Sequence, residues 1–167
     1  MQVVLGVDPG VVATGYGVVE SDGTSLRVLE AGVVKTRSSD PLPQRLSEIH
    51  RALKEVLEKF SPQVMAMEGL YSAYDHPKTA ILMGHARGVV CLAAGQSGVP
   101  VVDYAPARVK KSVIGAGRAS KGQVGRMVAL RLSLPEEPKP SHVADALAVA
   151  LCHIDTAARP ALLGGGA

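Results

Sequence analysis

The stretch MQVVLGVDPGVVATGYGVV, residues 1–19, places an aspartate where a short apolar run ends at Pro-Gly. Residues 3–7 are apolar and mostly β-branched, which is typical of a buried β-strand, and a second apolar run starts at Tyr16 after one tight connection. Asp8 therefore has two interpretations. An aspartate followed by proline and glycine suits a β-turn, and a carboxylate at the end of a strand can also hold a metal ion or a phosphate.

Strand-like segments recur along the chain with a change of spacing. Five of them are expected, at residues 3–7, 15–20, 26–36, 63–68 and 99–104. The first three follow one another through short turns, so they are expected to form an antiparallel meander. The last two are separated by long helical stretches, so they should lie parallel to their neighbours with helical crossovers. The sequence predicts an α/β fold with a five-stranded mixed sheet flanked by helices.

Helices are expected at residues 43–60, 77–96, 106–114, 121–132 and 141–158. The first has an apolar stripe opposite a charged face. The second is unusually rich in glycine and alanine, which allows close approach either of a second subunit's helix or of an ordinary packed neighbour, and both interpretations are open. Residues 1–158 would form a single domain, large enough to bury a core without disulfides. Residues 159–167 end in Gly-Gly-Gly-Ala and are expected to be a disordered tail.

The composition is that of a globular protein, with 47% hydrophobic and 20% charged residues. No apolar run reaches the length that a membrane span needs, and no basic leader or cleavage site precedes the first strand. Cys91 and Cys152 lie far apart in apolar helical segments, without the spacing of zinc ligands. We expect reduced cysteines and a cytoplasmic protein with no membrane association.

The net charge of +3 is unevenly distributed. Between Asp103 and Glu136 there is no acidic residue, and there are seven basic ones: Arg108, Lys110, Lys111, Arg118, Lys121, Arg126 and Arg131. The rest of the chain carries 11 basic and 15 acidic residues. A basic segment on an otherwise acidic domain favours a polyanionic partner on one face, although a run of charges more commonly marks a solvated helix surface.

Two further carboxylates resemble Asp8 in their setting. Glu68 also ends an apolar strand and is followed by glycine, so the two acids would converge at one end of the sheet if their strands are neighbours. Asp145 lies in an apolar helix, where it should be largely buried and must find a partner. His142 shares its helix face and could be that partner, as could a helix N-terminus. His153 lies about 16 Å further along the helix axis and is given a structural role.

Ligands that are rich in oxygen, with no cysteine among them, suit Mg²⁺ or Mn²⁺. Two such ions in one active site can activate a water and stabilise the leaving oxygen of a phosphoryl displacement. Together with the basic segment, these acids predict a metal-dependent nuclease.

The order of these motifs resembles the RuvC family of Holliday-junction resolvases, within the ribonuclease-H-like superfamily. The resemblance runs from Val3 to about His153 and rests on four segments: GVDPGVVATGYGVV, MAMEGLYSAYDHPKTAILMGHARGV, YAPARVKKSVIGAGRASKGQV and PSHVADALAVALCH. It implies a ribonuclease-H-like fold and a homodimeric endonuclease that resolves four-way DNA junctions in recombination and repair. It also implies symmetric nicking of two strands of like polarity, 5′-phosphate and 3′-hydroxyl ends, a thymine-containing cleavage core and the RuvA–RuvB branch-migration complex as a partner.

The resemblance implies roles for individual residues. Asp8, Glu68 and Asp145 match the catalytic acids of the family, which hold the metal ions. His142 stands where many members carry a fourth aspartate, so we include it among the catalytic and metal-binding residues. A neutral imidazole brings a nitrogen and no negative charge, which favours weaker binding of one ion or a preference for manganese.

The DNA contacts are implied in the same way. Tyr71 matches an aromatic position after the catalytic glutamate, where a ring can stack on bases or wedge between them at an open junction; a core tyrosine is the alternative. Lys110 and Lys121 match lysines expected near the scissile phosphate. Three further residues are expected to contact the DNA backbone: Lys111, Arg118 and Arg126.

Three rival interpretations remain. Actin-like ATPases also begin with a strand, an acid, glycines and a hairpin, but they need a duplicated domain, and ATP binding would distinguish them. Another ribonuclease-H-like nuclease could act on RNA, against which the basic helix pair and the segment SHVADALA argue. A junction-binding module without catalysis is the third, suggested by His142 and opposed by the three acids.

Overall fold

The computed structural model describes residues 1–69, 77–115 and 121–158. Its elements are β1 (Gln2–Asp8), β2 (Ala13–Ser21), β3 (Leu26–Lys35), α1 (Leu42–Phe60), β4 (Val64–Glu68), α2 (Pro77–Gln96), β5 (Val101–Tyr104), α3 (Pro106–Ile114), α4 (Lys121–Arg131) and α5 (Ser141–Ala158). All ten expected segments are confirmed, with no boundary more than two residues from its expected place. The expected tail, 159–167, lies outside the described residues.

The five strands form one mixed sheet in the order β3-β2-β1-β4-β5. The pairs β1–β2 and β2–β3 are antiparallel, and the pairs β1–β4 and β4–β5 are parallel. The meander and the two parallel strands are therefore as predicted. The short connections leave β1, β2 and β3 as direct neighbours, whereas α1 and α2 return the chain to the same end of the sheet. As a result, β1 and β4 are adjacent and end at the same edge.

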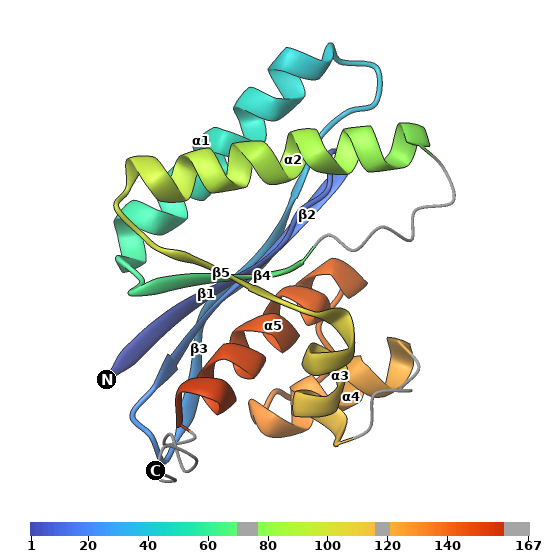
Figure 1. Cartoon of the computed structure of the whole chain (residues 1–167). Coiled ribbons are helices and arrows are strands. Elements are labelled where there is room, and N and C mark those ends of the chain that lie inside the picture. The colour runs from blue at the N-terminus through green and yellow to red at the C-terminus, as the bar shows by residue number, and fades with distance from the viewer. Residues whose placement is uncertain (70–76, 116–120, 159–167) are drawn as a thin grey trace, which may run out of the picture.

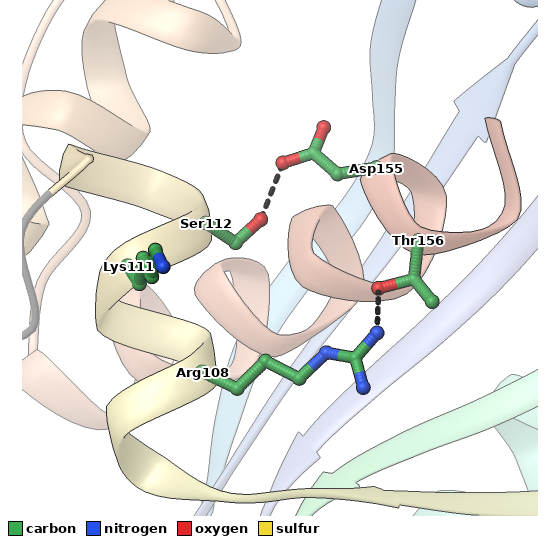
Figure 2. Close-up of a pocket in the computed structure, with 5 residues that line it drawn as sticks. All are labelled: Arg108, Lys111, Ser112, Asp155 and Thr156. Carbon is green, nitrogen blue, oxygen red and sulfur yellow. Dashed lines mark hydrogen bonds between the residues drawn. The ribbon is translucent and has the colours of Figure 1, made fainter. Parts of the chain in front are cut away.

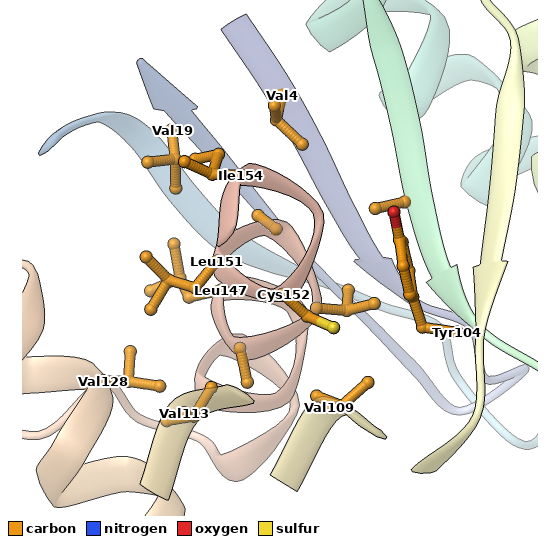
Figure 3. Close-up of a cluster of buried hydrophobic side chains, with 14 of the residues drawn as sticks. Val4, Val19, Tyr104, Val109, Val113, Val128, Leu147, Leu151, Cys152 and Ile154 are labelled. Carbon is orange, nitrogen blue, oxygen red and sulfur yellow. The ribbon is translucent and has the colours of Figure 1, made fainter. Parts of the chain in front are cut away.

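Helices cover the sheet on both faces (Figure 1). The pair α1 and α2 lies on one face, and α5, backed by α3 and α4, lies on the other. Side chains alternate between these layers along each strand: Leu5 and Met67 pack in the cluster that contains the α1 and α2 residues. Val4 belongs to the other cluster, and Figure 3 shows it with Val19 and Leu151 around α5. The alternation decides which side chains can reach α5.

Two glycines bring α5 into direct contact with the sheet. A Cβ atom on Gly6 would lie 1.9 Å from the main-chain oxygen of Ala146, and one on Gly15 would lie 2.0 Å from that of His142. Any larger residue would collide with the helix backbone. The first turn of α5 therefore rests on β2 next to the end of β1.

His153, near the other end of α5, has structural contacts with two strands. Its Nδ1 lies 2.8 Å from the Tyr104 hydroxyl oxygen, and its Nε2 lies 3.2 Å from the side-chain nitrogen of Gln2. The Gln2 amide donates to Nε2, so the proton of the neutral ring is on Nδ1, which donates to Tyr104. These contacts agree with the structural role expected for His153.

The stability of the fold should fall at mildly acidic pH because of His153. Burial lowers the pKa of His153 from its ordinary value of 6.5, so the unfolded chain binds more protons than the folded one below that pH. The free energy of unfolding should decrease as the pH falls below about 6.5 and should level off below the folded pKa. Urea denaturation between pH 7.5 and 5 measures this slope, and His153→Gln should have a shallower one. Equal slopes for the wild type and His153→Gln would show that His153 does not cause this pH dependence.

None of the helices in the described part of the chain combines the length and the apolar character that crossing a membrane requires.

Candidate active site

Asp8 and Glu68 end the two central parallel strands. The residues before them, Val7 of β1 and Met67 of β4, are in register with each other. Val7 and Met67 pack toward α1 and α2, so the next side chain on each strand points to the opposite face, toward α5. The two carboxylates therefore share one face and one end of the sheet, as predicted from their sequence settings. Asp8 is half-buried and Glu68 is exposed.

His142 reaches the same place from the first turn of α5. Its Nδ1 lies 2.7 Å from Oδ2 of Asp8. The His142 side chain is 43% exposed and the Asp8 side chain is 26% exposed. The imidazole N–H donates to the carboxylate, which fixes the orientation of Asp8. His142 thus contacts an acid 134 positions earlier in the chain. Both residues are accessible enough to meet a ligand.

Asp145 follows one turn after His142 on α5. Its neighbours Ala144 and Ala146 are buried, and Ala146 rests on Gly6 of β1. Asp145 itself is only half-buried, so the expectation that it is largely buried was wrong. The reason is that it lies at the margin of the contact between α5 and the sheet, where the apolar face of the helix ends. Asp145 is thus partly accessible, one helical turn from His142.

These four side chains are the ones that could hold a divalent ion. Three carboxylates and one imidazole form a donor set that suits Mg²⁺ or Mn²⁺. Within residues 1–69, 77–115 and 121–158, however, no three acidic, histidine or cysteine side chains form a ready-made metal cluster. Carboxylates that approach one another without a cation repel. The chemistry of the donor set therefore fits a divalent cation, whose charge would offset the repulsion between the carboxylates.

The basic residues of α3 and α4 lie on the same side of the sheet as α5. Lys111 and Arg126 are exposed, and Lys110 is half-buried. Lys121 begins α4, but its side chain is not among those described. Arg118 and Tyr71 lie outside the described residues, so their expected DNA contacts stay predictions. The placement of α3 and α4 beside α5 supports the interpretation of a basic face.

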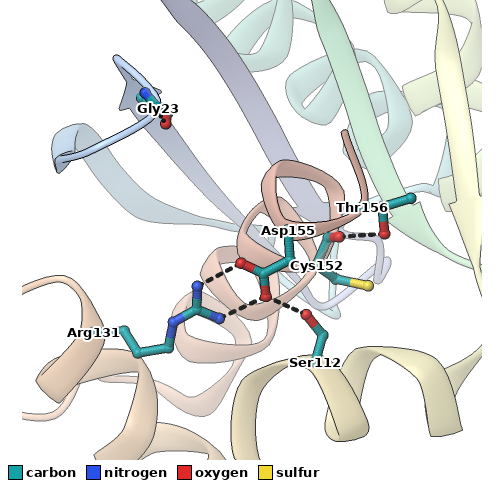
Figure 4. Close-up of polar contacts among 7 residues, drawn as sticks. Gly23, Ser112, Arg131, Cys152, Asp155 and Thr156 are labelled. Atoms are coloured by element: carbon teal, nitrogen blue, oxygen red, sulfur yellow. Dashed lines mark hydrogen bonds and ion pairs between the residues drawn. The ribbon is translucent and has the colours of Figure 1, made fainter. Parts of the chain in front are cut away.

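A polar network holds the two basic helices to α5. The guanidinium of Arg131 on α4 donates to both carboxylate oxygens of Asp155 on α5, at 2.6 and 2.9 Å. The Ser112 hydroxyl on α3 donates to the same carboxylate, and Figure 4 shows the three side chains converging. Because Asp155 is 26% exposed and Arg131 is 23% exposed, water screens the pair only in part. The network therefore ties the basic helices to the helix that carries His142 and Asp145.

Beside this network lies a cavity of about 210 Å³ between α3 and α5 (Figure 2). Arg108, Lys111, Ser112, Asp155 and Thr156 line it. Arg108 donates to the Thr156 hydroxyl at 3.3 Å and lies 5.5 Å from the centre of the Tyr104 ring. None of the four candidate metal ligands lines this cavity, so it is a feature of helix packing and is distinct from the candidate active site.

Sequence reasoning missed Arg87 and its partner Asp103. Arg87 Nη1 donates to the main-chain oxygen of Glu68 at 3.1 Å, and its Nη2 donates to Asp103 at 2.5 Å. The signal in the sequence is that one arginine stands in a helix otherwise composed largely of glycine, alanine and apolar residues. An isolated guanidinium in such a helix indicates a specific acceptor nearby.

The chain matches the family model described as "Crossover junction endodeoxyribonuclease RuvC" over residues 4–153. Two similar proteins carry that same name. The one from Rhodopirellula baltica is 54% identical over 149 residues, which are 89% of this chain and 84% of the relative. The one from Ruminiclostridium cellulolyticum is 44% identical over 162 residues, which are 97% of each chain.

Solved structures give the same result. The structure described as T. thermophilus RuvC in complex with Holliday junction substrate superposes with a TM-score of 0.90 at 42% identity, over 95% of this chain and 96% of that one. The yeast mitochondrial Holliday junction resolvase, at 16% identity, has a TM-score of 0.64 over 92% of this chain and 78% of that one. The second likeness shows the shared fold alone.

Proposed function

The chain belongs to the RuvC family of crossover junction endodeoxyribonucleases, and we propose that it resolves four-way DNA junctions at the end of β1 and β4. The observation that carries the proposal is the convergence of Asp8, Glu68 and the first turns of α5 on one face of the sheet. The basic helices α3 and α4 lie beside that face. A fold that superposes at a TM-score of 0.90 on a RuvC bound to its junction substrate supports the same substrate for this chain.

Asp8, Glu68, His142 and Asp145 would hold Mg²⁺ or Mn²⁺, with two ions in each active site. Bound divalent ions supply an activated water and stabilise the charge on the leaving oxygen. The protein's own part is orientation: β1 presents Asp8 from the centre of the sheet, and the His142 N–H holds the Asp8 carboxylate. Attack on the phosphorus with departure of the 3′ oxygen leaves 5′-phosphate and 3′-hydroxyl ends. With a neutral imidazole among the ligands, Mn²⁺ is expected to support the reaction better than Mg²⁺.

Contacts with the DNA backbone would come from the two basic helices. Lys111 and Arg126 project into solvent and can pair with phosphates, with further contacts proposed from Lys110, Arg118 and Lys121. Tyr71 follows Glu68 by three positions, so a base stacked on its ring would lie near the cut. Salt should weaken binding strongly, because each neutralised phosphate releases counterions.

Symmetric nicking requires two active sites, and we propose that a second copy packs on the outer face of α2. The inner face of this helix buries Ala86, Val90, Ala93 and Ala94, so α2 is also a packed crossover helix. On the outer face, a Cβ added to Gly84 or Gly88 would meet no atom within 4 Å. Ile81 is 63% exposed and Leu92 is 53% exposed. An open stripe of small and apolar side chains suits two-fold packing of like helices.

Gly88→Glu is expected to convert the dimer to a monomer. A glutamate on the outer face of α2 would place two like charges across the two-fold axis and would prevent close approach. Sedimentation velocity at micromolar protein concentration measures the change. Gly122→Glu on α4, where an added Cβ also meets no atom within 4 Å, is the matched control and should remain dimeric. A dimeric Gly88→Glu variant would contradict this interface.

The proposed activity places the protein with the cell's DNA in the cytoplasm and makes the RuvA–RuvB branch-migration complex its partner.

The direct test of the chemistry uses a mobile four-way junction labelled on each strand in turn, with Mg²⁺, Mn²⁺ or a chelator. We expect paired nicks at equivalent positions in two strands of like polarity, which DNA ligase reseals. Tight binding without nicks in either metal would instead support a junction-binding module.

A further inference from the structure

The guanidinium of Arg87 joins α2 to the ends of two strands. Nη1 donates to the main-chain oxygen of Glu68 at 3.1 Å, and Nη2 donates to Oδ1 of Asp103 at 2.5 Å. Only 16% of the Arg87 side chain is exposed, whereas 51% of the Asp103 side chain is. The arginine is thus enclosed at the end of β4, and its carboxylate partner is largely hydrated.

The contact is made from the face of the sheet opposite to the Glu68 carboxylate. Asp103 is in register with Met67, and Met67 packs toward α1 and α2, so both side chains lie on the α2 face. Glu68 follows Met67 and its side chain points to the α5 face. Arg87 therefore contacts the main chain of Glu68 from the face of the sheet opposite to the Glu68 side chain.

The peptide group that follows Glu68 is held at both of its ends. Its oxygen accepts the hydrogen bond from Arg87, and its N–H, which belongs to Gly69, donates to the main-chain oxygen of Tyr104 at 2.9 Å. A peptide plane fixed on both sides fixes the ψ angle of Glu68. That angle, with the strand pairing of β4, sets the direction in which the Glu68 carboxylate leaves the sheet.

We propose that Arg87 is a positioning residue that orients Glu68 toward the divalent ions of the active site. The inference rests on the proposed function, in which Glu68 is a metal ligand. Groups that orient ligands typically change metal affinity by 10- to 100-fold when they are removed. A lysine replaces the forked guanidinium only in part, because one ammonium group does not span the carbonyl and the carboxylate with the same geometry.

An ordinary ion pair between Arg87 and Asp103 is the simpler explanation of this contact. The substitution Asp103→Asn distinguishes a plain ion pair from the positioning of Glu68. The asparagine removes the negative charge but keeps an oxygen that can accept from Arg87, and it leaves the bond to Glu68 in place. If positioning is the role, Asp103→Asn should keep the metal dependence of the wild type. If Arg87 only neutralises Asp103, Arg87→Met and Asp103→Asn should behave alike.

The experiment compares the wild type with Arg87→Met, Arg87→Lys and Asp103→Asn, with Arg27→Met as the matched control. Arg27 forms a remote, exposed ion pair with Glu20 at 2.7 Å. Two dependences on Mn²⁺ concentration are measured: the rise in the unfolding temperature of the DNA-free protein, and the rate of junction nicking. We expect Arg87→Met to need at least about 10-fold more Mn²⁺ than the wild type for the same effect in both measurements. Arg87→Lys should lie between, and Arg27→Met should match the wild type.

Equal Mn²⁺ dependence for Arg87→Met and Arg27→Met would overturn the positioning role while leaving the proposed function intact. A wild type that neither nicks the junction nor is stabilised by Mn²⁺ would overturn the proposed function and this inference with it. Should Arg87→Met fail to fold, Arg87→Lys decides, because it keeps the positive charge and loses only the forked geometry. A wild-type Mn²⁺ dependence in Arg87→Lys would then overturn the inference.

Discussion

Asp8→Asn is expected to lower the rate of junction nicking about 1,000-fold, because several kcal/mol of charge stabilisation by the ions are lost and each 1.36 kcal/mol is a factor of ten. The substitution removes one negative charge from the ligand set and changes the side-chain volume little. Its amide oxygen can still accept the hydrogen bond that Asp8 now accepts from His142. The fold and the binding of junction DNA should therefore persist.

Single-turnover nicking of a labelled junction measures the rate, and a gel-shift titration measures binding. Asp40→Asn, which also removes one carboxylate but from the loop before α1, is the matched control and should cut at the wild-type rate. Nicking by Asp8→Asn within a few-fold of the wild type would remove Asp8 from the catalytic machinery.

Gly15→Ala should destabilise the protein by about 3 kcal/mol or more, the upper part of the range for overpacking. The added Cβ would lie 2.0 Å from the main-chain oxygen of His142 and 2.4 Å from its carbonyl carbon. These are backbone atoms of α5, so the clash is relieved only if the first turn of the helix moves off β2. The same movement would take His142 away from Asp8, and nicking should fall together with stability.

Thermal unfolding tests the first part of this prediction. For a chain of this size, 3 kcal/mol corresponds to a fall of roughly 6–12 °C in the unfolding temperature. Gly122→Ala is the matched control: nothing lies within 4 Å of the added Cβ, and alanine is a better helix former than glycine. It should be at least as stable as the wild type. A Gly15→Ala variant as stable as Gly122→Ala would show that α5 does not rest on β2 as described.

The elements of the fold could be predicted because local signals mark their limits. Pro9-Gly10 ends β1 and Ser61-Pro62 follows α1, and short runs of apolar, often β-branched residues between such signals indicate strands without any tertiary information. Asp8 and Glu68 could be related from the sequence because each stands at the end of such a run and is followed closely by glycine. The sequence left open whether their strands are neighbours, and the parallel pairing of β1 with β4 in the structure brings the two acids to the same edge.

The contacts of the site could not be predicted in the same way. Helical spacing placed His142 beside Asp145, but its hydrogen bond goes to Asp8, because the contact depends on how closely α5 approaches β2. Helical periodicity also gives the direction of Asp145 and not its depth, which is why its burial was overestimated. The contact of Arg87 could not be predicted, because every residue has a main-chain oxygen and a hydrogen bond to one does not depend on the side chain of the acceptor residue.

The most direct test of junction resolution compares three substrates under the same conditions: a mobile four-way junction, a linear duplex of the same sequence, and an RNA–DNA hybrid. Each is incubated with wild-type protein and Mn²⁺, with a chelator control. Paired nicks are expected in the junction alone, and the chelator should abolish them. Cutting of the hybrid with no cutting of the junction would contradict junction resolution and would point to a nuclease directed at RNA.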